Sequence, residues 1–172
     1  MAKKIVIVED DIDQRTNYID AIGKKGYSVR GFSSRTEAIA GFDLELPDLV
    51  ILDIILGDEV DAGFELCRDL LARSPNLPVI FLTERIAEID KISGLRLGAW
   101  DYLPKPISLD YLSEKISSLL RIHEARNLAA KGSTEAKIVG DMSIDQEALL
   151  VSWQNNPINL SGTHPLLATC NK

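Results

Sequence analysis

The sequence has few of the residue types that cross-link small extracellular folds or hold zinc. Its 172 residues include two histidines and two cysteines, Cys67 and Cys170, which lie far apart. This spacing argues against a disulfide framework or a zinc site and predicts reduced thiols. No apolar run approaches the roughly 18 residues of a membrane-spanning helix, and residues 1–4 lead directly into a strand-like segment instead of a signal-peptide core. We therefore expect a cytoplasmic globular protein without a membrane partner.

Basic side chains are fewer than acidic ones. The chain has 19 Lys and Arg against 26 Asp and Glu, a formal net charge of −7, and no concentrated basic run. Such a chain repels nucleic acid unless a local basic surface overcomes the repulsion. DNA binding therefore needs support from something other than composition.

Short β-branched runs alternate with longer amphipathic stretches along most of the chain. This rhythm is typical of parallel strands joined by crossover helices. The predicted fold class is α/β, with a doubly wound (βα)5 parallel sheet. The predicted strands are 4–8, 28–31, 49–52, 79–82 and 102–103, and the predicted helices are 12–25, 34–45, 63–73, 87–97 and 109–126.

Acidic side chains follow two of the predicted strands. Glu9, Asp10 and Asp11 come directly after the first strand, and Asp53 comes directly after the third. The carboxyl ends of parallel strands meet at one edge of the sheet, so these carboxylates should converge. Close carboxylates repel one another unless a cation neutralises them, and a hard divalent ion with oxygen ligands suits them. We expect Mg²⁺.

Two further polar side chains stand at the ends of the remaining strands. Thr83 offers a hydroxyl and Lys105 offers a cation, and both groups suit phosphate oxygens. Acids at strand ends also serve as solvated turns or helix caps, and for Glu9 and Asp10 alone that interpretation is equally good. The five groups together favour a functional site.

Four segments in this order carry a family resemblance, namely 6–11, 47–53, 82–83 and 98–106. Over about residues 3–122 the chain resembles the receiver domain of two-component response regulators of the OmpR/PhoB class. The resemblance implies a flavodoxin-like or receiver-like sheet with strand order 2-1-3-4-5. It also implies a receiver domain over residues 1–123, which is a signalling module that catalyses only its own phosphorylation and dephosphorylation.

The same resemblance assigns roles to the residues at the sheet edge. Asp53 would accept a phosphoryl group from a sensor histidine kinase, and Thr83 and Lys105 would bind the phosphoryl oxygens. The ligands of Mg²⁺ would be Glu9, Asp10, Asp53 and the main-chain carbonyl of Ile55.

A conformational switch is the next implication. Phosphorylation would draw the Thr83 hydroxyl inward and let Tyr102 turn toward the core. Tyr102 can also be read as an ordinary half-buried strand aromatic. The family usually holds the bond before the second proline cis, so we expect a cis Lys105–Pro106 peptide, which unselected X-Pro bonds adopt only about 5% of the time.

Active members of this class form homodimers through the fourth helix, fifth strand and fifth helix. Asp101 and Lys115 match one of the usual ion pairs, whereas Trp100 and Tyr111 stand where acids are usual. An aromatic patch could replace ion pairs, which are individually weak at surfaces. A monomer with an incidental apolar patch is the alternative. The candidate interface residues are Lys91, Trp100, Asp101, Tyr111 and Lys115.

Some positions depart from the family pattern. The segment 54–63 is longer than usual and has Gly57 where proline is typical, and Glu84 stands where a small residue is common. We expect Glu84 to slow reaction with small phosphodonors such as acetyl phosphate. Segments 56–59 and 63–68 also resemble regulators of a dedicated sortase system in proteobacteria.

The C-terminal part has a different composition. Residues 124–137 are predicted to form a linker, and residues 138–172 an antiparallel β fragment that resembles the opening sheet of a winged-helix effector, truncated before any recognition helix. We expect residues 126–172 to pack poorly on their own. Transcription regulation through DNA is therefore expected only where a complete effector domain exists.

Other functions remain open at this point. A magnesium-dependent phosphohydrolase with an aspartyl nucleophile usually has a second acid two residues later, where this chain has Ile55. A docking module without phosphorylation would need a defective site. A phosphorylatable receiver that acts by protein–protein interaction or as a phosphate sink is the closest alternative.

Overall fold

The computed structural model describes residues 2–132, 137–139, 142–145, 150–153 and 156–158. The chain divides into two compact units, Met1–Glu124 and Ala125–Lys172. Within the described residues, no helix combines the length and apolar character that a membrane span needs.

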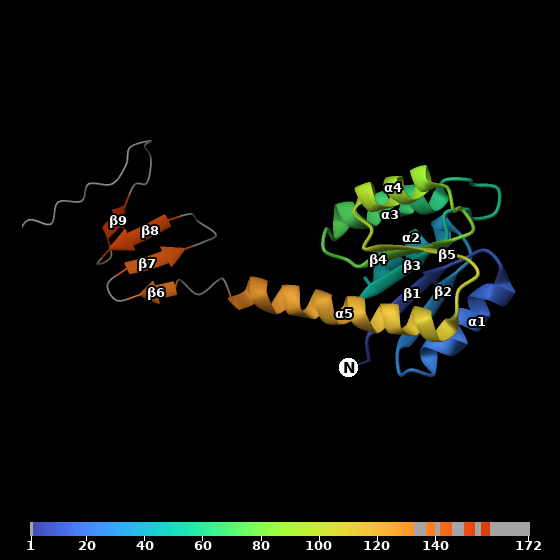
Figure 1. The fold of residues 1–172 in the computed structure, drawn as a ribbon, viewed down its shortest axis with the longest axis horizontal. Coiled ribbons are helices and arrows are strands. Elements are labelled where there is room, and N and C mark those ends of the chain that lie inside the picture. Colours follow the sequence, from blue (N-terminus) through green and yellow to red (C-terminus); the bar gives the residue numbers. More distant parts are fainter. Residues whose placement is uncertain (1, 133–136, 140–141, 146–149, 154–155, 159–172) are drawn as a thin grey trace, which may run out of the picture. The chain divides into compact units, whose positions relative to one another are not determined.

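The first unit is built on a five-stranded parallel sheet with strand order β2-β1-β3-β4-β5 (Figure 1). This order confirms the predicted fold class. The strands are β1 (Lys4–Val8), β2 (Ser28–Phe32), β3 (Leu49–Leu52), β4 (Val79–Thr83) and β5 (Asp101–Pro104).

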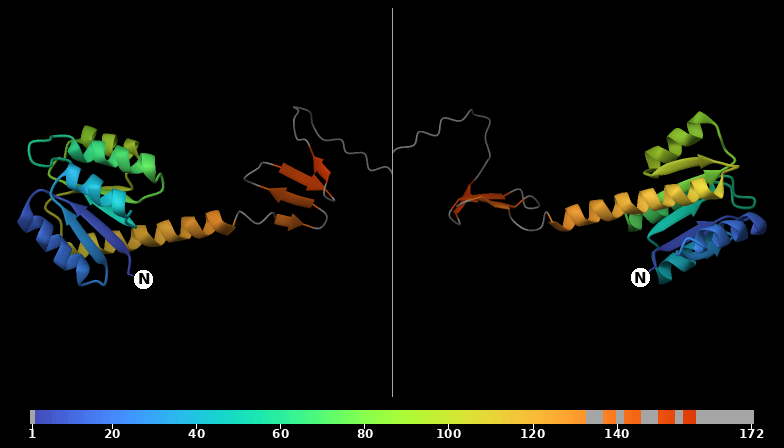
Figure 2. Two further views of the ribbon diagram at one scale, coloured as in Figure 1. Left: turned by 180° about the vertical axis from the view of Figure 1, so that it is seen from behind. Right: turned by 60° about the horizontal axis from the view of Figure 1, so that its bottom comes forward.

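Helices cover both faces of this sheet (Figure 2). Buried residues of α1 and α5 pack on one face, and buried residues of α2 and α3 pack on the other. The helices are α1 (Ile12–Gly23), α2 (Arg35–Leu44), α3 (Ala62–Arg73), α4 (Glu88–Leu97) and α5 (Leu109–Gly132).

The core consists of two clusters, because side chains along each strand point alternately to the two faces of the sheet. In β1, Ile5 and Ile7 belong to the cluster under α1 and α5, while Val6 and Val8 belong to the cluster under α2 and α3. Successive strand side chains point to opposite faces, and both faces are covered, so β3 and β4 are buried at every residue. Each fully buried aliphatic side chain stabilises the fold by about 1.5–3 kcal/mol. This rigid sheet fixes the loops at its carboxyl edge.

The fifth helix is longer than predicted. It continues to Gly132, whereas the sequence interpretation ended it near Arg126 and began a linker at residue 124. Residues 125–131 are rich in alanine, leucine, lysine and arginine, which are strong helix formers. The polar and charged residues among them were mistaken for a linker.

The second unit contains four antiparallel strands in the order β6-β7-β8-β9. They are β6 (Lys137–Val139), β7 (Met142–Asp145), β8 (Leu150–Trp153) and β9 (Asn156–Ile158). β9 begins two residues before its predicted start, and the predicted residues 159–160 lie outside the described part of the chain. Pro157 stands in this outer strand, which is where a residue without an N–H group is tolerated.

Candidate functional site

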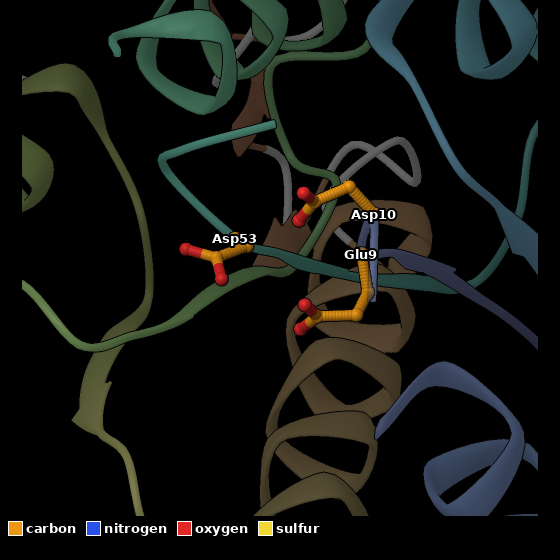
Figure 3. Close-up of side chains that lie close together, drawn as sticks. All are labelled: Glu9, Asp10 and Asp53. Atoms are coloured by element: carbon orange, nitrogen blue, oxygen red, sulfur yellow. The ribbon is translucent and has the colours of Figure 1, made fainter. Parts of the chain in front are cut away.

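Three carboxylates converge at the carboxyl edge of the parallel sheet (Figure 3). Glu9 and Asp10 follow β1, and Asp53 follows β3, which pairs with β1. One carboxylate oxygen from each residue lies within 4.8 Å of the others. Glu9 and Asp53 are buried, whereas Asp10 is exposed. The cluster predicted from the strand ends is therefore present.

Lys105 brings a positive charge into this cluster from the loop after β5. Its Nζ atom donates hydrogen bonds to Asp53 Oδ2 and to Glu9 Oε2, both at 2.6 Å. The Lys105 side chain is only 6% exposed, and its peptide bond to Pro106 is cis. Burial lowers the pKa of Lys105, but the hydrogen bonds to Asp53 and Glu9 raise it by more, so the pKa lies above its ordinary value. The ammonium group is therefore charged at neutral pH.

In Glu9 the effect of burial on the pKa outweighs that of the hydrogen bond. Burial raises the pKa of this carboxyl, the hydrogen bond from Lys105 lowers it, and the net pKa lies above the ordinary value of 4.5. The nearby charges of Asp53 and Asp10 also raise it. Three acids against one lysine leave excess negative charge, and carboxylate oxygens are the ligands that Mg²⁺ prefers. The donor set fits a hard divalent cation.

The backbone around Asp53 fixes the direction of its side chain. Asp53 Oδ1 accepts hydrogen bonds from the N–H groups of Ile54 at 2.6 Å and Ile55 at 3.3 Å. The start of α3 packs directly on the Asp53 peptide, because a Cβ atom at Gly63 would lie 2.1 Å from the Asp53 carbonyl oxygen. Only glycine permits this approach without a backbone shift.

The loop after Asp53 contacts the cluster a second time. Its Gly57 has φ of +61°, a left-handed conformation that favours glycine, and its N–H donates to Asp10 Oδ2 at 3.1 Å. Leu56 and Glu59 exchange two backbone hydrogen bonds, which close a tight turn around Gly57. Gly57 therefore allows the left-handed backbone that this turn requires.

Arg15 is a site residue that the sequence interpretation missed. Its guanidinium donates to the backbone carbonyls of Glu9 at 2.5 Å and Asp10 at 3.1 Å. These bonds hold the end of β1 to the first turns of α1. The only sequence signal for this role is a basic residue about one helical turn after the acidic run.

Thr83 lies at the end of β4 and is fully buried. Its Oγ1 accepts a hydrogen bond from the Arg85 N–H at 3.3 Å. Thr83 borders a small cavity of about 180 Å³ over the acids, which brings the predicted residues into one site. The cavity is lined by Glu9, Asp10, Asp11, Gln14, Asp53, Ile55, Thr83, Glu84 and Lys105.

Tyr102, on β5, already points inward. Its hydroxyl donates to the backbone carbonyl of Arg85 at 2.8 Å, and its ring lies 5.8 Å from that of Phe81. Burial raises the pKa of Tyr102 to about 12. The buried position that the resemblance expects for Tyr102 after phosphorylation is thus already occupied in this structure.

The candidate dimer residues lie on α4, β5 and α5 and around them. Lys115 forms an ion pair with Asp101 at 2.9 Å, and its Nζ lies 5.6 Å from the centre of the Tyr111 ring. Tyr111 is 51% exposed, whereas Trp100 is partly buried and packs edge-on against His123 at 5.9 Å. Lys91 is a partly buried residue of α4. The two aromatic residues therefore have different environments.

This arrangement agrees with the comparison with known families. Residues 5–117 match the family described as the response regulator receiver domain. The chain belongs to this family. A receiver domain of a two-component response regulator is a signalling module and not an enzyme in its own right. The cluster of Glu9, Asp10 and Asp53 is typical of the metal and phosphorylation site of such a domain.

Curated relatives extend the similarity beyond the receiver domain. The chain is 34% identical over 157 residues to the transcriptional regulatory protein CreB of Escherichia coli, covering 90% of this chain and 65% of that protein. It is 33% identical over 163 residues to the response regulator MprA of Mycolicibacterium vanbaalenii, covering 95% of this chain and 69% of that protein. The chain thus spans about two thirds of the length of these relatives.

Solved structures show the same fold. A CheY-like receiver domain protein from Methanospirillum hungatei is 28% identical, with a TM-score of 0.69, over 73% of this chain and 99% of that one. The non-phosphorylated HemR receiver domain from Leptospira biflexa is 27% identical, with a TM-score of 0.64, over 69% of this chain and 94% of that one. Both support the receiver fold of the first unit.

Proposed function

We propose that this protein is a phosphoacceptor response regulator, in which Asp53 receives a phosphoryl group from a sensor histidine kinase. The observation that carries the proposal is the surrounding of Asp53, whose carboxylate lies within 4.8 Å of two other acids and 2.6 Å from the buried Lys105 ammonium. Membership of the receiver family supports a histidine kinase as the donor.

The chemistry needs little beyond positioning and charge. An oxygen of Asp53 bonds to phosphorus as the P–N bond of a phosphohistidine breaks, and the electron pair of that bond goes to the imidazole nitrogen. Lys105 and the Thr83 hydroxyl bind phosphoryl oxygens. When bound, Mg²⁺ supplies positive charge that offsets the charge on the phosphoryl oxygens. Its ligands would be Glu9, Asp10, Asp53 and the Ile55 carbonyl.

The response passes through Thr83 and Tyr102. The new phosphoryl oxygens draw the Thr83 hydroxyl inward, and the inward Tyr102 ring is retained. The protein then forms a homodimer through the surface of α4, β5 and α5. Exposed apolar side chains on α4, Ile89 at 67% and Leu95 at 51%, support this surface as an interface. The contributing residues would be Lys91, Trp100, Asp101, Tyr111 and Lys115.

The output is proposed to be transcription regulation of the OmpR/PhoB kind in the cytoplasm. Relatives named as transcriptional regulatory proteins and the four-stranded antiparallel sheet support this role. DNA binding requires a complete winged-helix effector beyond the sheet formed here. Placement among dedicated sortase regulators rests on segments 56–59 and 63–68 alone. Protein–protein interaction or phosphate storage is the alternative output.

The function is tested by phosphorylation followed by mapping of the added mass. The protein is incubated with Mg²⁺ and a phosphodonor, digested, and examined by mass spectrometry. We expect one phosphorylated peptide that contains Asp53, and none in the Asp53→Ala variant. Asp58→Ala, which removes an exposed acid from the same loop, serves as the matched control and should be modified normally. Modification that persists in Asp53→Ala would overturn the proposal.

A further inference from the structure

Arg85 joins the two loops that flank the phosphorylation site. Its Nε donates to Asp90 Oδ2 at 3.0 Å, and its Nη2 donates to the other oxygen of the same carboxylate. Its Nη1 donates to Asp61 Oδ1 at 2.6 Å and to the Val60 carbonyl at 3.2 Å. We call these four residues the Arg85 clamp. The clamp ties the loop after β4 to the loop after β3.

The Asp61 side chain binds Arg85 and does not cap its own helix. It occupies the N-cap position of α3, where aspartate usually accepts a hydrogen bond from the first helical turn. Its side chain makes no such bond in this structure. The carboxylate binds Arg85 instead. Because Gly63, two residues later, packs on the Asp53 carbonyl, the clamp fixes the end of the helix that touches the phosphoacceptor.

The backbone of Arg85 contacts both switch residues. Its N–H donates to Thr83 Oγ1, and its carbonyl accepts from the Tyr102 hydroxyl. A displacement of Thr83 toward Asp53 therefore has to be accommodated at Arg85. The side chain of Arg85 determines how firmly that segment is held.

The two carboxylates of the clamp are not equivalent. The Asp90 side chain is 13% exposed, whereas that of Asp61 is 63% exposed. Solvent and salt weaken exposed ion pairs much more than buried ones. Asp90 is therefore the stronger partner of Arg85, and Asp61 is the weaker one. The Arg85 guanidinium also lies 5.4 Å from the Phe64 ring, which packs edge-on against Phe81.

We propose that Arg85 is a positioning residue for the phosphorylated state. Its clamp holds the loop after β4 against the start of α3, with Tyr102 inward and Thr83 facing the site, so that the phosphoryl group binds to a preorganised set of donors. This inference rests on the proposed function. It adds a residue that contacts neither the phosphoryl group nor the metal.

Titration with beryllofluoride, an analogue of the phosphoryl group, tests this role. We expect Arg85→Ala to weaken beryllofluoride binding in the presence of Mg²⁺ by about tenfold, the size of one charged hydrogen bond. Asp61→Asn should weaken it less, and Arg85→Lys should restore part of the affinity because lysine keeps the charge but not the forked geometry. Affinity for Mg²⁺ alone should fall much less than affinity for beryllofluoride, since the clamp contains no metal ligand.

The controls separate this inference from the proposed function. Arg73→Ala, which removes the surface ion pair with Asp43, should leave beryllofluoride affinity unchanged. If the wild-type protein does not bind beryllofluoride, the proposed function fails. If it binds and Arg85→Ala binds equally well, the positioning role fails. If Arg85→Ala does not fold, the test is made with Asp61→Asn. Unchanged beryllofluoride affinity in that folded variant would overturn the role of the clamp.

Discussion

Lys105 and Asp53, 52 residues apart in the sequence, share a hydrogen bond of 2.6 Å in the buried part of the site. The same ammonium group also binds Glu9, so one cation serves two acids. Without further positive charge the cluster remains under-neutralised, and this imbalance is the physical basis for metal binding at the sheet edge.

Removing the charge of Lys105 should separate metal binding from phosphoryl transfer. We expect Lys105→Met to lower the rate of phosphorylation by about 100-fold, the usual effect of losing a group that stabilises transferring charge. Mg²⁺ affinity should rise, because the competing cation is gone. Rates with a small phosphodonor and Mg²⁺ titrations measure both effects, with Lys25→Met as a surface control. Equal losses of both properties would contradict this account.

Glu9→Gln should stabilise the metal-free protein. The pKa of Glu9 is raised, so the folded state holds its proton more tightly than the unfolded state does. Stability should therefore fall as the pH rises from 4.5 through the raised pKa of the folded protein, and the neutral variant should lack this loss. Thermal unfolding at neutral pH should show an increase in Tm of about 2–4 °C. A lower Tm would show that the Lys105 contact outweighs burial.

Glu84 should restrict small phosphodonors. Glu84 is exposed and lines both the 180 Å³ site cavity and a cavity of about 570 Å³, and Lys105 lines the same two cavities. A negative side chain there repels acetyl phosphate. We expect slow labelling of the wild-type protein by acetyl phosphate and faster labelling of Glu84→Ala. Rapid labelling that the substitution leaves unchanged would contradict this role.

Gly63→Ala should disturb both the fold and the site. The added Cβ would lie 2.1 Å from the Asp53 carbonyl oxygen, so the start of α3 must move. We expect a loss of about 2 kcal/mol or more in the free energy of unfolding, together with weaker Mg²⁺ binding. Gly23→Ala is the matched control, because nothing lies within 4 Å of its added Cβ. Denaturant titration of the two variants compares them directly, and equal stability would be inconsistent with the close packing described.

Cys67 should be unreactive in the folded protein. It is fully buried in α3, and burial raises the pKa of its thiol to about 12, so almost no thiolate forms at pH 8. In a Cys170→Ser variant, we expect thiol labelling to be negligible under native conditions and complete in denaturant. Fast native labelling would indicate that α3 opens readily.

The fold was readable from the sequence because its signals are local. The bounds of β1 and β3 were predicted as observed, since each contains a run of four apolar residues that is followed directly by an acid. The convergence of Glu9, Asp10 and Asp53 followed from the topology of parallel strands. The end of α5 was misplaced, because an exposed helical segment of alanine and polar residues resembles a linker in composition.

Contacts between distant loops were not readable in this way. Arg85 and Asp61 are 24 residues apart, and no periodic pattern links them. The failure of Asp61 to cap α3 is visible only in three dimensions. Arg15 was missed for a related reason, since its partners are backbone carbonyls that carry no sequence signal.

A structure of the protein with Mg²⁺ and beryllofluoride tests the central claim most directly. The account predicts beryllofluoride on an oxygen of Asp53, with its fluorine atoms contacting Lys105 and Thr83. It also predicts a metal ion held by Glu9, Asp10, Asp53 and the Ile55 carbonyl. Beryllofluoride bound away from Asp53, or a metal ion that these carboxylates do not ligate, would contradict it.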